Sequence, residues 1–80
     1  MNDFPIIQKG IYRHNKKEQL YEVLGIALHT ETNEPLVIYC PLYENQYEYF
    51  VRPYSMFMEE VKIDGKKQPR FELLKDEISS

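Results

Sequence analysis

The alternation of apolar and polar positions along the chain predicts a series of short strands. The most apolar run is Leu20–His29, where apolar residues occupy both parities, a pattern that suits either a strand covered on both faces or a helix. Gly25 in the middle of this run disfavours a helix. We therefore expect a strand with a bulge at Gly25, which would allow a small sheet to curl.

Turn signals separate this run from shorter apolar segments. Asn33 tolerates a positive φ, and Asp64-Gly65 is a strong signal for a tight hairpin turn. Ser55 is placed to cap one helical turn, whose apolar residues Met56–Met58 would close one end of a barrel. The other expected strands are Gly10–His14, Leu36–Cys40, Tyr47–Arg52, Val61–Ile63 and Pro69–Leu74.

Five to six short strands with one short helical turn predict a mostly β fold, in the form of a small SH3-like barrel. The chain has 80 residues, which suffice for one domain. We expect an N-terminal lead-in over residues 1–9, the barrel domain over residues 10–74 and a frayed tail over residues 75–80.

Composition narrows the class of protein. The net charge is −3, and residues 18–60 carry eight carboxylates against a single base, Arg52. Without a basic stripe, a nucleic-acid partner is not expected. The N-terminus lacks a signal peptide, no run is long enough to span a membrane, and a lone cysteine fits a reducing compartment. We therefore expect a cytoplasmic protein.

A set of short motifs occurs in a fixed order over about residues 9–74. The motifs are Gly10–His14, Tyr21–Gly25, Ala27–Thr32, Val37–Tyr39, Leu42–Tyr43, Phe50–Pro53, Met56–Phe57, Val61–Gly65 and Pro69–Phe71. In these motifs the chain resembles a bacterial family of short proteins called domain of unknown function 1653. The resemblance implies a small SH3-like β-barrel, and it implies no activity, because that family is uncharacterised.

Metal and nucleophile chemistry find little support in the sequence. His29-Thr30-Glu31 has the His-x-Glu spacing of zinc deaminases, but the Pro-Cys-x-x-Cys partner of that motif is missing. His14, His29 and Cys40 do not make a convergent ligand set. Cys40 lies in an apolar run and is interpreted as a structural residue rather than the nucleophile of a Cys–His pair. We expect no metal, no cofactor and no catalytic residue.

Two side-chain sets could bind a ligand. The tyrosines from Tyr39 to Tyr54 could stack a planar ligand beside Arg52 or could simply fill the core. The arginines Arg13, Arg52 and Arg70 could clamp an anion or could pair with the many carboxylates. We expect strand ends to gather a polar ligand site from Arg13, His14, His29, Glu31, Tyr39 and Arg52, the alternative being a rim of separate surface charges.

These observations favour a non-catalytic binding or accessory module for an anionic or aromatic small ligand or for a protein partner. The alternative is a small enzyme, or a subunit of one, that acts on an anionic small molecule through Arg, His and Glu groups. A weak nucleic-acid binder is the third hypothesis. The sequence leaves the oligomeric state open.

Overall fold

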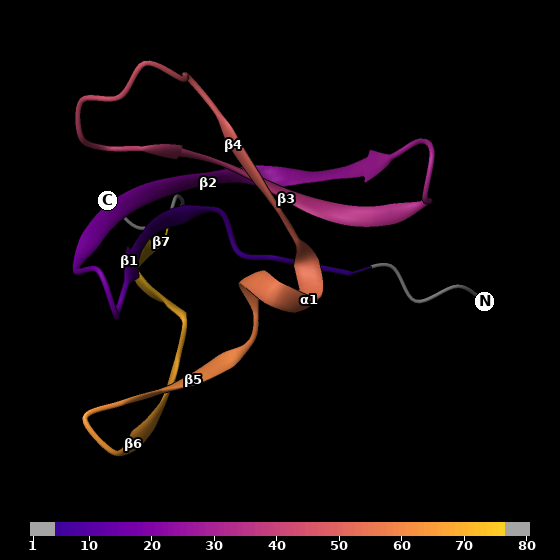
Figure 1. The fold of residues 1–80 in the computed structure, drawn as a ribbon. Helices are drawn as coiled ribbons and strands as arrows, with labels where there is room; N and C mark the ends of the chain where they lie inside the picture. The colour runs from indigo at the N-terminus through magenta and orange to yellow at the C-terminus, as the bar shows by residue number, and fades with distance from the viewer. Residues whose placement is uncertain (1–4, 77–80) are drawn as a thin grey trace.

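The computed structural model describes residues 5–76, and these residues form a mostly β structure with one short helix (Figure 1). Six of the seven strands overlap the predicted segments in the predicted order, and the strand Lys66–Pro69 was not predicted as a separate one. The elements are β1 (Gly10–His14), β2 (Gln19–His29), β3 (Glu34–Pro41), β4 (Phe50–Pro53), α1 (Tyr54–Phe57), β5 (Glu60–Ile63), β6 (Lys66–Pro69) and β7 (Phe71–Asp76).

Five strands form one antiparallel sheet in the order β4-β3-β2-β1-β7, and β5 and β6 form a separate hairpin. Within residues 5–76 the outer strands β4 and β7 do not pair with each other, so the predicted SH3-like barrel is not confirmed as a closed barrel. The expected last strand was Pro69–Leu74. Instead β6 ends at Pro69, and β7 begins after Arg70 and crosses to β1.

The bulge predicted in β2 is present, and the helical alternative for this segment is wrong. Val23 pairs with Tyr39 and Gly25 pairs with Ile38, so that Leu24 is an extra residue in the ladder. Gly25 has a φ of +154°, a conformation that residues with a side chain rarely adopt. The β2–β3 turn contains Asn33 with a φ of 61°, as its sequence predicts.

The segment around α1 differs from expectation in several details. β4 begins at Phe50 rather than at Tyr47. The residue before the helix is Pro53, and no side chain caps the helix, so the prediction of Ser55 as a cap was wrong. Of the three apolar residues expected to close a barrel, only Phe57 is buried, whereas Met56 and Met58 are about half exposed.

The ends of the chain follow the predicted boundaries in part. Residues 5–9 of the lead-in have no regular secondary structure, and residues 1–4 lie outside the described residues. β7 reaches Asp76, two residues past the expected end of the domain, and residues 77–80 of the expected tail lie outside the described residues. Among the described residues, no helix is long and apolar enough to cross a membrane.

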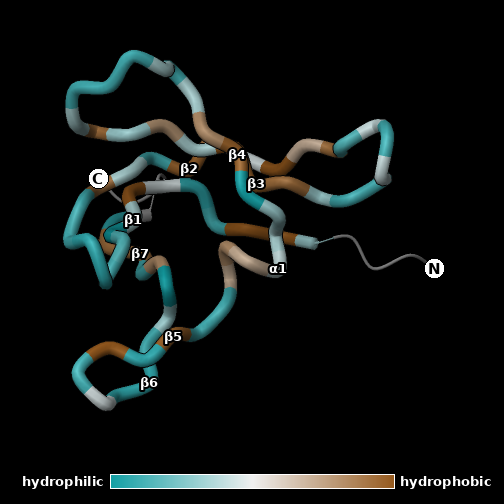
Figure 2. The backbone as a smooth tube through the Cα atoms, in the orientation of Figure 1, coloured by the Kyte–Doolittle hydropathy of each residue, from teal (hydrophilic) through white to brown (hydrophobic). Residues whose placement is uncertain are grey.

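The core is aromatic and lies on the inner face of the sheet, where α1 covers it. By contrast, the β2–β3 turn and the loop that precedes β4 are hydrophilic (Figure 2). Phe57, Val23 and Val37 are the most deeply buried side chains. Rings of this size bury roughly 150–250 Å² each, which suits a chain with little room for a core. The buried apolar residues are Tyr12, Tyr21, Val23, Val37, Tyr39, Phe57 and Phe71.

Candidate functional site

Polar side chains meet around the ring of Phe71 on the inner face of the sheet. Alternate residues of a strand face the same side, so His14 on β1 and Tyr39 on β3 point inward with the core. Arg52 on β4 lies opposite the buried Val37 and faces inward as well. The structure thus brings together three of the six residues predicted for the site, His14, Tyr39 and Arg52.

Arg52 is held by aromatic groups rather than by a carboxylate. Its Nε donates a hydrogen bond to the Tyr39 hydroxyl at 3.3 Å, and its Cζ lies 5.5 Å from the centre of the Phe71 ring. Such a contact between a guanidinium and a ring face is attractive. Within residues 5–76 the ion pairs are Lys67–Glu60 and Arg70–Glu59, and neither includes Arg52.

His14 is buried, and its ring packs edge-on against Phe71 with centroids 4.8 Å apart. The backbone N–H of Lys17 donates to His14 Nδ1 at 3.2 Å, so the proton of the neutral ring is placed on Nε2. Burial lowers the pKa of His14 below its usual value of 6.5, and the nearby charges of Lys17, Arg52 and Arg70 lower this pKa further. His14 is therefore a neutral hydrogen-bonding group at pH 7.

Two tyrosine hydroxyls and an amide extend this polar set. The hydroxyls of Tyr21 and Tyr43 lie 3.1 Å apart, and the Tyr21 hydroxyl donates to Gln19 Oε1 at 3.4 Å. Burial and the hydrogen bond to Tyr43 raise the pKa of Tyr21 far above the usual value for a phenol. Tyr21 therefore stays protonated, and the set offers neutral donors and acceptors beside Arg52.

The other three predicted residues lie elsewhere. Arg13 is next to His14 in sequence, so its side chain takes the opposite face of the sheet, where it is paired with the exposed Leu20 and Glu72. His14 pairs with the first residue of β2, and His29 is its last residue. The 11 residues of β2 have a length of roughly 33 Å along the strand.

Glu31 lies in the turn after His29, and its backbone N–H donates to His29 Nδ1 at 3.3 Å. The prediction of one six-residue cluster was therefore wrong in its extent. His14 pairs with Gln19 at the start of β2, whereas His29 ends this strand and Glu31 follows in the β2–β3 turn.

The remaining chemical motifs also separate in space. Cys40 pairs opposite Glu22, on the face of β3 away from Tyr39, and burial raises the pKa of its thiol. No set of three or more His, Cys, Asp or Glu side chains in the described part of the chain could hold a metal ion. Of the tyrosines, Tyr39 is in the core, whereas Tyr47 and Tyr49 are mostly exposed.

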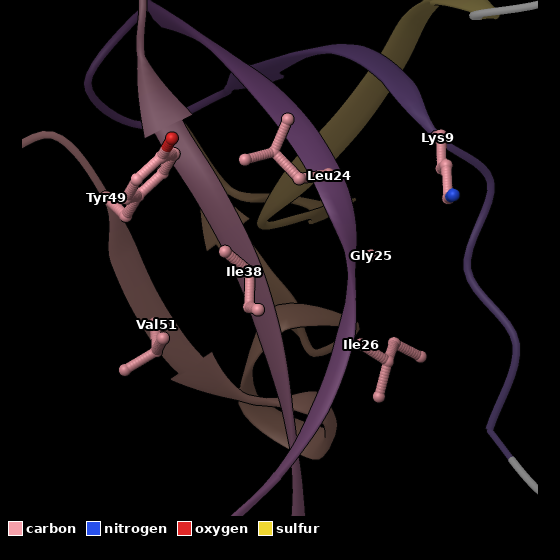
Figure 3. Close-up of a pocket in the computed structure, with 7 residues that line it drawn as sticks. All are labelled: Lys9, Leu24, Gly25, Ile26, Ile38, Tyr49 and Val51. Carbon is pink, nitrogen blue, oxygen red and sulfur yellow. The ribbon is translucent and has the colours of Figure 1, made fainter.

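Sequence reasoning missed a hollow on the outer face of the sheet. It has a volume of about 650 Å³, within the range of ligand sites, and its walls are mostly apolar (Figure 3). The apolar residues of β2 on both parities were the signal that could have revealed it. The lining residues are Lys9, Leu24, Gly25, Ile26, Ile38, Tyr49 and Val51.

Comparison with known proteins places this small antiparallel β protein among proteins of unknown function. The family described as protein of unknown function DUF1653 matches residues 10–73, and the chain belongs to that family. A crystal structure of a family member from Bordetella bronchiseptica is similar, with 31% sequence identity, a TM-score of 0.80 and coverage of 92% of this chain and 95% of that chain. No curated protein matches the chain.

Proposed function

We propose that this protein is a non-catalytic binding module for a small anionic ligand, which Arg52 holds with the help of His14. The observation that supports this most directly is how the guanidinium of Arg52 is held. Its Nε donates to Tyr39 and its Cζ lies over the Phe71 ring, while no ion pair among the described residues uses its terminal N–H groups. A guanidinium held in place in this way suits a carboxylate or phosphate, which it can bind through two parallel hydrogen bonds.

Although the chain as a whole is acidic, the charged groups near His14 are positive and favour an anionic ligand. The protein carries 13 acidic and 10 basic residues, yet the charged groups that act on His14 are the cations Lys17, Arg52 and Arg70. A local positive potential of this kind raises the concentration of anions near the site. Neutral His14 adds a hydrogen-bond donor, and its pKa would rise when an anion binds beside it.

The same geometry supports binding over catalysis. The enzyme alternative relied on Arg, His and Glu groups, but His29 and Glu31 lie at the end of β2 remote from the end that pairs with His14. A general acid or base must reach the reacting group within hydrogen-bond distance. Arg52, by contrast, lies close enough to His14 for its charge to lower the pKa of His14.

The test is an NMR titration of the His14 ring with inorganic phosphate and with acetate, at constant ionic strength set with chloride. We expect saturable shifts of the ring signals and a rise in the pKa of His14 as either anion binds. Arg52→Gln should abolish the saturable shifts. The matched control Lys62→Gln removes a charge from an exposed residue of β5 and should leave them unchanged.

Two outcomes would overturn the proposal. In one, Arg52→Gln binds both anions as the parent protein does. In the other, Lys62→Gln weakens binding as much as Arg52→Gln, which would show a response to net charge rather than to a site.

A further inference from the structure

Arg70 carries a second guanidinium near the candidate anion site. It directly precedes Phe71, the ring against which His14 packs and over which Arg52 lies. Asn15, which follows His14, fixes the backbone at this point, because its N–H donates to the carbonyl of Arg70 at 3.0 Å. Besides burial, the nearby charges of Arg52 and Arg70 lower the pKa of His14. Two guanidinium groups therefore act on one imidazole.

The guanidinium of Arg70 is only partly paired. Its Nη2 donates to Glu59 Oε1 at 2.9 Å, and this is the ion pair that it forms within residues 5–76. Its Nε is buried and has no hydrogen-bond partner in that range. The side chain of Arg70 is only 22% exposed, so little water can replace the missing contacts. A second anion would satisfy this group better than Glu59 does alone.

The ion pair between Glu59 and Arg70 is weak enough for a ligand to replace. The Glu59 side chain is 50% exposed, and a pair at the surface contributes little free energy because water and salt screen it. The backbone N–H of Arg70 also donates to the carbonyl of Glu59 at 2.9 Å. That backbone contact keeps the two residues adjacent when their side chains separate, so the exchange needs no change in the strands.

The two guanidinium groups determine which anion matches the site. A phosphate monoester carries close to two negative charges above about pH 7, since its second pKa is about 6, and both charges lie on the oxygens of one group. A monocarboxylate or a phosphate diester carries only one charge. A dicarboxylate carries two, but its carbon chain separates them, whereas Arg52 and Arg70 both act on the single ring of His14.

We propose that the ligand of this site is a phosphate monoester, which Arg52 and Arg70 bind together after Arg70 has left Glu59. Arg52 contributes terminal N–H groups that no ion pair among the described residues uses. Arg70 contributes the second positive charge, and neutral His14 donates through Nε2. The inference rests on the proposed anion-binding function, to which it adds a ligand class and a second binding residue.

The probes are methyl phosphate and dimethyl phosphate, titrated at constant ionic strength with NMR detection of the His14 ring. At about pH 8 the first ester carries two charges and the second carries one, while both present phosphate oxygens. We expect methyl phosphate to bind at least about tenfold more tightly. Arg70→Gln should reduce this preference to about threefold or less and should change the affinity for dimethyl phosphate by less than about twofold.

Variants of Glu59 test the exchange of partners. Glu59→Gln should raise the affinity for methyl phosphate about two- to fivefold, because no carboxylate then competes for Arg70. Glu60→Gln is the matched control, since Glu60 is the next residue and its ion pair is with Lys67. It should have a smaller effect. In the Arg70→Gln background, Glu59→Gln should lose most of its effect, which a double-mutant cycle measures.

The amide spectrum shows whether Arg70→Gln is folded. If it is not, Arg70→Lys serves in its place, because lysine keeps the charge but cannot donate two parallel hydrogen bonds, and it should also reduce the preference. The proposal fails if the parent protein binds the two esters equally well or if the Arg70 variant keeps the full preference. It also fails if Glu59→Gln and Glu60→Gln act alike, which would show a response to net charge.

These outcomes differ from a failure of the anion site itself. If neither ester binds the parent protein, or if Arg52→Gln binds both as the parent does, the anion-binding function is wrong and this inference fails with it. If both esters bind through Arg52 with equal affinity, the anion site stands and only the phosphate monoester and the role of Arg70 are contradicted.

Discussion

The rings of Phe57 and Phe71 lie parallel, with centroids 4.0 Å and planes 6° apart. Phe57 ends α1 and Phe71 begins β7, so this contact joins the helix to the strand that pairs with β1. Since Phe57 occupies one face of the Phe71 ring, Arg52 is left the other face. Phe71 therefore supports the core and the candidate anion site together.

Replacing Phe71 with alanine should destabilise the protein more than any exposed substitution. Removing a buried phenylalanine typically costs about 3–5 kcal/mol, and a chain of this size has only about 5–15 kcal/mol of stability in total. We expect Phe71→Ala to lose most of its cooperative unfolding transition in urea. Leu74→Ala, at a half-exposed position of β7, is the control and should change the free energy of unfolding by less than about 0.5 kcal/mol. Equal effects would contradict the central role of Phe71.

Gly25→Ala should destabilise the protein through its backbone rather than through crowding. The φ of +154° belongs to a region that is nearly exclusive to glycine and costs other residues about 1–3 kcal/mol. The nearest side-chain atom to an added Cβ would be Lys9 Cε at 3.8 Å, an ordinary contact distance. Lys9→Ala should therefore fail to rescue Gly25→Ala in urea unfolding. Full rescue would show that packing, not backbone conformation, requires glycine here.

The stability of the protein should decrease in acid because of His14. Its pKa is lowered in the folded state, so the unfolded chain takes up this proton first as the pH falls. The contribution of neutral His14 is complete above about pH 6.5, the unfolded value, and is lost as the pH falls toward and below the folded pKa. His14→Asn keeps an acceptor for the Lys17 N–H and should flatten this slope between pH 7 and 5. An unchanged slope would assign the acid sensitivity to other groups.

Asn15 should control the docking of the β5–β6 hairpin. This buried side chain donates to the carbonyl of Pro69 at 2.9 Å, and its backbone N–H donates to the carbonyl of Arg70 at 3.0 Å. Asn15→Ala removes the first bond and leaves a carbonyl without its partner, at a cost of about 1–3 kcal/mol. We expect faster amide hydrogen exchange in residues 60–69 and little change in β2 and β3. Uniform acceleration throughout the sheet would indicate global destabilisation instead.

Local backbone chemistry made much of the fold predictable. The limits of β1, the bulge at Gly25 and the turns at Asn33 and Asp64-Gly65 depend on neighbouring residues, and all appear in the structure. The last strand pairs with β1, and this choice of partner depends on contacts between distant residues, such as that between Asn15 and Pro69, which no local pattern reveals. The way the outer strands of the sheet are arranged, and so whether a barrel closes, could not be predicted from local signals.

The alternation of side chains along a strand could have predicted part of the candidate site. Neighbouring residues of a strand face opposite sides of the sheet, so Arg13 and His14 could have been placed on different faces. The length of β2 could have shown that His29 lies far from both residues. The contact between Arg52 and Tyr39 required the register of β3 on β4, which the intervening loop leaves open in the sequence.

The pairing of β1 with β7 also determines when this protein can fold. β1 lies between its neighbours β2 and β7, one joined to it by a tight turn and the other distant in sequence. Pairings between distant segments are slow to form, because a long loop must close before any contact compensates for the lost entropy. During synthesis, the β1–β3 meander can therefore assemble early, but its aromatic inner face stays uncovered until Phe71 has emerged. That interval is when the nascent chain would depend most on chaperones.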